Sequence, residues 1–266
     1  MKIVSIAKED EITFNINRTP HGDRYLYNTD EITLSVKDIN IIVGCNGFGK
    51  STLLQEIRQQ LVGIKDIRVI TSFKKLKDEE YKEDRPQYLY WDLVRDGHQN
   101  ALSLYGFQGK MNRVVNSITS SEGQNIFRDF VTAYMETIKQ AIENIEEHYT
   151  ESNKIFVLVD GLDSGLDVIR LREFIKGSKL QKENIKKDYG IDLIYILTSN
   201  SYELSENNLC IYPYDNTAMR FESYSDYVEF IASTIEMAEN RKEAKTDNKK
   251  NKKMRNKNRR IKPRKI

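Results

Sequence analysis

The strongest constraint on this chain is segment 44–52, which reads Gly-Cys-Asn-Gly-Phe-Gly-Lys-Ser-Thr. It matches the pattern G-x-x-x-x-G-K-[S/T] at every fixed position. The glycines let the backbone curl so that successive N–H groups point at phosphate oxygens, and the N-terminus of a following helix adds partial positive charge. The segment stands between an apolar run, residues 39–43, and an amphipathic helix expected to begin near Lys50. The sequence therefore predicts a phosphate-binding loop.

The rest of the chain alternates buried strands with helices. Residues 154–159 and 191–197 are short, apolar runs that suit buried strands, and helical spacing is present around 168–175 and from 123 to 149. This alternation predicts an α/β fold with a largely parallel sheet flanked by helices. Residues 2–43 alternate apolar and polar positions, which predicts an N-terminal antiparallel β part.

Two further stretches give less uniform signals. Residues 87–109 contain several aromatic side chains but show no clear period. A last helix is expected over residues 224–237. Its inner face should consist of Tyr227, Phe230, Ile231 and Ile235.

The loop resembles the G-x-N-G-x-G-K-S-T loop of ABC-type ATPases, including the chromosome-maintenance and recombination-repair branch. The resemblance extends over residues 2–212 and implies a P-loop NTPase that holds ATP and Mg²⁺. The stretch between residues 52 and 120 is too short for a long coiled-coil arm, so this would be a head without an arm, as in small ATPases of phages and mobile elements. The nucleotide-binding residues expected in the loop are Asn46, Gly47, Gly49, Lys50, Ser51 and Thr52, with Lys50 on the β- and γ-phosphates and Ser51 on Mg²⁺.

The second half of the expected site follows the strand at residues 154–159. Asp160 ends this apolar run, as the magnesium-holding aspartate of a Walker B segment does. Residues 164–167 read Ser-Gly-Leu-Asp and resemble the D-loop of the same family. The position of the family's catalytic glutamate is occupied by Gly161, which cannot polarise water. Asp163 is the candidate substitute base, and the alternative is that Asp163 merely caps the following turn.

Three more features resemble parts of an ABC-type site. Residues 120–124, Ser-Ser-Glu-Gly-Gln, are similar to the signature segment, in which Ser121 and Gly123 would contact ATP bound to the opposite subunit. Plain helix capping by a serine is the alternative. Asn200 lies where the family often has a histidine that senses the γ-phosphate. Tyr25 or Tyr27 could stack on adenine, although a tyrosine on a surface hairpin is the simpler interpretation.

Charge is distributed unevenly along the chain. Residues 241–266 hold fourteen Lys or Arg against two acidic residues, a net charge of +12, which leaves −10 for residues 1–240 because the whole chain carries +2. We expect an ATPase domain over residues 1–240 and a basic, disordered tail over 241–266. The tail would bind a polyanion, DNA or RNA, without sequence choice, and the alternative is a solubilising tail that docks on the acidic body.

The chain has two cysteines and no apolar run of membrane-spanning length, so we expect a cytoplasmic protein without a membrane partner. Two functions remain open on these residues. The first is an ATP-hydrolysing head-to-tail homodimer associated with nucleic acid. The second is a slow or non-hydrolysing ATP switch that dimerises and recruits a protein partner. A P-loop kinase is a third, weaker candidate.

Overall fold

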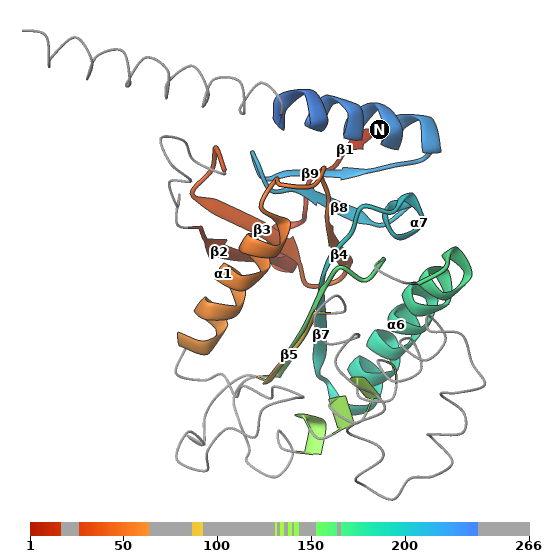
Figure 1. The fold of residues 1–266 in the computed structure, drawn as a ribbon. Helices are drawn as coiled ribbons and strands as arrows, with labels where there is room; N and C mark the ends of the chain where they lie inside the picture. The colour runs from red at the N-terminus through yellow and green to blue at the C-terminus, as the bar shows by residue number, and fades with distance from the viewer. Residues whose placement is uncertain are drawn as a thin grey trace, which may run out of the picture.

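The computed structural model describes residues 1–16, 27–63, 87–92, 153–163 and 166–238, and part of a helix at residues 131, 134, 135, 138, 139 and 141–143. Within these residues the chain forms a seven-stranded sheet and a separate two-stranded sheet, with helices packed around them (Figure 1). No helix in these ranges is both long enough and apolar enough to cross a membrane.

The central sheet has the strand order β1-β9-β8-β4-β7-β6-β5. Strands β8, β4, β7, β6 and β5 are parallel, and β9 and β1 extend one edge in antiparallel pairing. The apolar strands β4, β6 and β7 are buried over almost their whole length, as expected for strands covered on both faces. The bounds are β1 Lys2–Ile3, β4 Ile39–Ile42, β5 Gln87–Asp92, β6 Lys154–Asp160, β7 Asp192–Thr198, β8 Leu209–Tyr212 and β9 Thr217–Arg220.

A second, two-stranded sheet lies in the N-terminal part of the chain. Its strands, β2 (Glu11–Asn15) and β3 (Glu31–Ser35), pair in antiparallel register after a short 3-10 helix, η1 (Lys8–Asp10). The α/β class, the largely parallel sheet and the antiparallel N-terminal part are therefore confirmed. The arrangement is consistent with a P-loop NTPase fold.

Helices cover the two faces of the central sheet. The bounds are α1 Lys50–Gly63, α6 Val168–Tyr189, α7 Tyr202–Ser205 and a last helix over residues 224–238. Helices α1 and α6 lie on opposite sides of the sheet, and the last helix lies beside β1 and β9 (Figure 1). The expected helix at 168–175 is real but continues to Tyr189, where Gly190 ends it in a left-handed conformation.

Each face of the sheet has its own hydrophobic core. Leu53, Leu54 and Ile57 of α1 pack with the β2–β3 hairpin and with side chains from one face of β6 and β7. On the other face, Phe174 of α6 packs with Tyr134 of the partly described helix. Burial of each of these large side chains contributes about 1.5–3 kcal/mol, so the two cores fix the sheet between α1 and α6.

The register of the parallel strands sets the position of the site. Ile42 of β4 lies opposite Thr198 of β7, and Val159 of β6 lies opposite Leu197. The carboxyl ends of β4, β6 and β7 therefore meet at one edge of the sheet. In open α/β sheets, this edge is the usual place for ligands.

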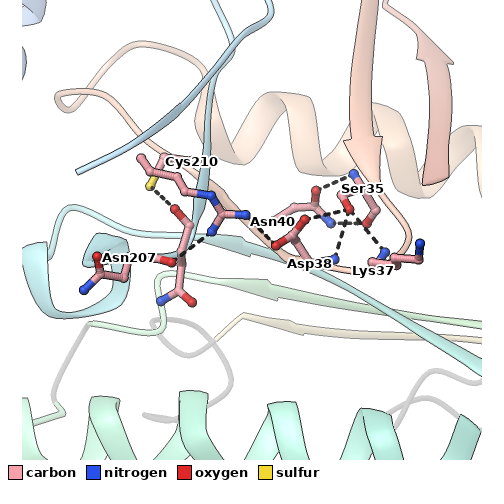
Figure 2. Close-up of polar contacts among 8 residues, drawn as sticks. Ser35, Lys37, Asp38, Asn40, Asn207 and Cys210 are labelled. Carbon is pink, nitrogen blue, oxygen red and sulfur yellow. Dashed lines mark hydrogen bonds and ion pairs between the residues drawn. The ribbon is translucent and has the colours of Figure 1, made fainter. Parts of the chain in front are cut away.

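Polar contacts hold the turn between β3 and β4, which lies at the amino end of β4 (Figure 2). Ser35 Oγ donates to Asp38 Oδ2 at 3.0 Å, and the Asn40 side chain forms two hydrogen bonds with the backbone of Ser35. Asp38 also forms an ion pair with Arg220 of β9 at 2.7 Å. These contacts fix the position of the start of β4, the strand that leads into the glycine-rich loop 44–52.

The structure corrects several expectations from the sequence. Residues 87–92, which show no clear period, form the edge strand β5, and β8 and β9 were missed entirely. In the last helix, Tyr227 and Phe230 are buried as expected, but Ile235 is 44% exposed. Its expected place on the inner face is taken by the fully buried Thr234.

Candidate functional site

The glycine-rich segment forms the connection between β4 and α1. Gly44, Gly47 and Gly49 have φ values of 138°, 88° and 81°, a region that L residues rarely adopt. Helix α1 begins at Lys50, immediately after the last of these glycines. The loop therefore curls in front of a helix N-terminus, a geometry that suits an anion.

Lys50 is buried at the centre of the loop. Its Nζ donates to Gly44 O at 2.7 Å, to Cys45 O at 3.2 Å and to Asn200 Oδ1 at 2.7 Å. Burial lowers the pKa of the Lys50 ammonium, while Asp163 raises it. Two backbone carbonyl oxygens of the loop and one side-chain amide oxygen therefore fix the position of the Lys50 ammonium.

Ser51 and Asp160 join the start of α1 to the end of β6. The Ser51 Oγ donates to Asp160 Oδ1 at 3.0 Å, and the Thr198 hydroxyl donates to the same carboxylate oxygen. Thr198 Oγ1 also accepts the Gly161 N–H at 2.8 Å, so it joins the ends of β6 and β7. Hydroxyl and carboxylate oxygens are the ligands that Mg²⁺ prefers, so Ser51 and Asp160 suit this ion in the presence of a phosphate. Among the residues that the structure describes, no three His, Cys, Asp or Glu side chains come together as metal ligands.

Asp163, after β6, is joined to Asn200, after β7. The Asn200 N–H donates to Asp163 Oδ2 at 2.7 Å, and the Asn200 Nδ2 donates to Asn46 Oδ1 at 3.1 Å. Together with the bond from Lys50, these contacts place Asp163 and Asn200 beside the phosphate loop. Asp163 thus holds the loop that follows β7 and also presents a carboxylate at the site.

Gly161 has a φ of 64°, in the left-handed region. A residue with a side chain costs about 1–2 kcal/mol there, so the backbone at this position is suited to glycine. The backbone conformation at Gly161 therefore favours glycine over a residue with a side chain.

Two aromatic residues support the loop from inside the protein. Tyr27 is only 1% exposed, and its hydroxyl donates to Gly49 O at 2.8 Å. Neither adenine stacking nor a surface position fits this buried side chain, so both interpretations of Tyr27 are wrong. Phe48 is equally buried and packs on Tyr212 with ring centroids 5.6 Å apart. The other candidate, Tyr25, lies outside the described residues.

The contact between Tyr27 and Gly49 leads to a stability prediction. A Cβ at Gly49 would lie 2.9 Å from the Tyr27 hydroxyl oxygen, whereas a Cβ at Gly47 would meet nothing within 4 Å. Both glycines have positive φ, so Gly47→Ala measures the backbone strain alone, about 1–2 kcal/mol. Gly49→Ala adds the clash, and we expect about 2–3 kcal/mol of destabilisation in urea unfolding. Equal losses in the two variants would show that Tyr27 does not constrain the loop.

The structure brings together most of the residues that the sequence singles out. Hydrogen bonds join Lys50 and Asp163 to Asn200, and Ser51 to Asp160. The exposed residues Asn46, Gly47 and Thr52 lie in the glycine-rich loop and at the start of α1. The expected signature residues Ser121 and Gly123, part of the D-loop and the tail 241–266 lie outside the described residues.

The sequence analysis missed two hydroxyl residues of the site, Thr198 and Thr234. Thr198 carried a usable signal, because it is the polar residue that ends an apolar strand, as Asp160 does. Thr234 carried none, since its contact with the loop spans 189 positions in sequence.

Comparisons with known proteins give little further information. No protein-family model matches the sequence, and a comparison with curated proteins finds no match. Among solved structures, the chain is similar to cbiO1 from Clostridium perfringens, described as part of the ABC transporter complex cbiONQ. The identity is 15% and the TM-score 0.35, over 79% of this chain and 87% of that one. A likeness of this level carries no argument, so the function is inferred from the site itself.

Proposed function

We propose that this chain is an ABC-type ATPase that binds ATP and Mg²⁺ at the loop between β4 and α1. One observation carries the proposal. Ser51 at the start of α1 donates to Asp160 at the end of β6, and the neighbouring Lys50 donates to carbonyls of the glycine-rich loop, in which three glycines have positive φ. A cation, a metal-ligating hydroxyl and a carboxylate in this order are the groups that a nucleoside triphosphate with Mg²⁺ requires.

Each residue then has a defined task. Lys50 neutralises phosphate charge, and Ser51 and Asp160 would hold Mg²⁺, which supplies charge neutralisation at the phosphate oxygens. Asp163 accepts a proton from the attacking water as general base. Asn200 donates a hydrogen bond near the terminal phosphate and keeps Asp163 in place through its backbone N–H. Thr198 orients Asp160 by donating to one of its carboxylate oxygens.

Assembly and partners belong to the same proposal. Two copies would close head to tail, with Ser121, Gly123 and Asp167 of each facing the nucleotide of the other. The basic segment 241–266 supports an association with DNA or RNA, and the acidic remainder of the chain would keep the body itself away from the phosphates. In the structure, Asp167 caps α6 by accepting the Arg170 N–H at 2.9 Å. A contact with a partner copy would be an additional task of the same side chain.

A second candidate function is a slow or non-hydrolysing ATP switch that recruits a protein partner. The glycine-suited backbone at Gly161 favours it, because the position next to Asp160 offers no carboxylate. In this case bound ATP would hold the dimer closed.

Steady-state ATP hydrolysis and ATP affinity of the full-length protein test the proposal. We expect Mg²⁺-dependent binding of ATP and turnover that rises with duplex DNA or structured RNA. Tight binding without turnover under any condition would favour the switch. No detectable ATP binding in the presence of Mg²⁺ would contradict both functions.

A further inference from the structure

A polar side chain of the last helix, Thr234, reaches the glycine-rich loop 44–52. Thr234 is completely buried, and its Oγ1 lies 3.2 Å from the backbone nitrogen of Cys45, the second residue of the loop. The same hydroxyl lies 2.8 Å from Ile231 O, one turn earlier in the helix. Since a backbone N–H can only donate, the hydroxyl accepts from Cys45 and gives its own proton to Ile231 O.

Hydrogen bonds fix the peptide groups on both sides of Cys45. Its N–H is bound by Thr234, and its carbonyl accepts from the Lys50 Nζ at 3.2 Å. Cys45 is itself buried. Without the threonine hydroxyl, its N–H would have to find another acceptor, and the loop would have to move to provide one.

Aromatic packing joins the same helix to the loop a second time. Phe48 of the loop packs on Tyr212 of β8, and Tyr212 packs edge-on against Phe230 of the helix, with ring centroids 5.6 Å and 5.2 Å apart. The Tyr212 hydroxyl also lies 3.9 Å from Met237 Sδ. The helix is therefore seated against the loop by packing, and Thr234 adds the directional contact.

We propose that Thr234 is a positioning residue of the nucleotide site, which sets the conformation of the phosphate loop through the Cys45 amide. This inference rests on the proposed function, because it assigns Thr234 to the binding of ATP. Thr234 touches neither nucleotide nor metal in this proposal. It keeps the loop in the shape that receives phosphates, so its loss weakens ATP binding and leaves the chemical step unchanged.

The test compares three full-length variants in ATP affinity and in steady-state turnover. Thr234→Val keeps the shape of the side chain and removes the acceptor, so we expect the Kd for ATP to rise about tenfold. Turnover at saturating ATP should stay within about twofold of the wild type. Thr234→Ser restores the hydroxyl and should recover the wild-type affinity. Ser233→Ala is the matched control, because Ser233 makes the same type of bond to Phe230 O but does not touch the loop.

The outcomes separate this inference from the proposed function. If the wild type binds ATP and Thr234→Val binds it equally well, the positioning role is wrong and the ATPase proposal stands. If the wild type does not bind ATP, both are wrong. Amide hydrogen exchange in the wild type tests the contact between Thr234 and Cys45 even if the Thr234 variants fail to fold. The Cys45 N–H should exchange slowly, and exchange as fast as that of an exposed loop amide would overturn the inference.

Discussion

Replacement of Lys50 by methionine is expected to weaken ATP binding about 100-fold, because each hydrogen bond from a charged donor contributes about 1.5–3 kcal/mol. Methionine keeps most of the volume of the buried side chain and removes only the ammonium. The loss should be measured by titration with ATP and Mg²⁺.

The same variant should remain folded. The Lys50 ammonium is desolvated, as its lowered pKa indicates, so its removal relieves a burial cost that its three oxygen partners offset. We expect the thermal unfolding midpoint to stay within a few degrees of that of the wild type. Lys179→Met, on the exposed side of α6, is the matched control. An affinity within threefold of the wild type in Lys50→Met would remove the phosphate-loop assignment.

The second large effect is expected at Asp163. Asparagine at this position keeps an oxygen that can accept the Asn200 N–H but loses the ability to take a proton from water. If Asp163 is the general base, Asp163→Asn should lower kcat about 100-fold and leave the Kd for ATP within about threefold of the wild-type value.

The alternative role of Asp163, a structural contact only, gives the opposite result. Asp163→Asn would then turn over ATP at the wild-type rate, and only Asp163→Ala, which removes the acceptor as well, would lower activity. Asp188→Asn, on the exposed side of α6, is the matched control for the change of charge. Full turnover in Asp163→Asn would therefore reassign Asp163 to holding the Asn200 loop.

Local patterns were sufficient to predict the parts of the site that are contiguous in sequence. The loop 44–52 is a single segment with its own backbone requirements, and the glycines with positive φ lie at three of its positions. Likewise, Asp160 was identifiable because it ends an apolar strand, as the aspartate of a Walker B segment does. The same strength of pattern explains why β4, β6, β7, α1 and α6 were expected.

Short or ambiguous local signals explain why β5 and β9 were missed. The four inner residues of β5, Tyr-Leu-Tyr-Trp, form an apolar run so short that its sequence cannot distinguish a strand from a buried helix segment. β9 is four residues long and only partly buried. The helical period of residues 224–237 is equally compatible with Thr234 or Ile235 facing the core, so it could not show that Ile235 is exposed. The hydrogen bond between Thr234 and Cys45 depends on the tertiary structure.

The sequence by itself determined the glycine-rich loop 44–52, the carboxylate of Asp160 at the end of an apolar strand, the α/β class and the uneven distribution of charge along the chain. These properties depend on neighbouring residues, whose spacing is fixed by helix and strand geometry. Only the tertiary structure decided that Thr198 orients Asp160, that Asp163 holds Asn200, and that Tyr27 and Thr234 support the loop. The reason is physical: these contacts join residues that are far apart in the chain, and the register of parallel strands and the packing of helices bring them together.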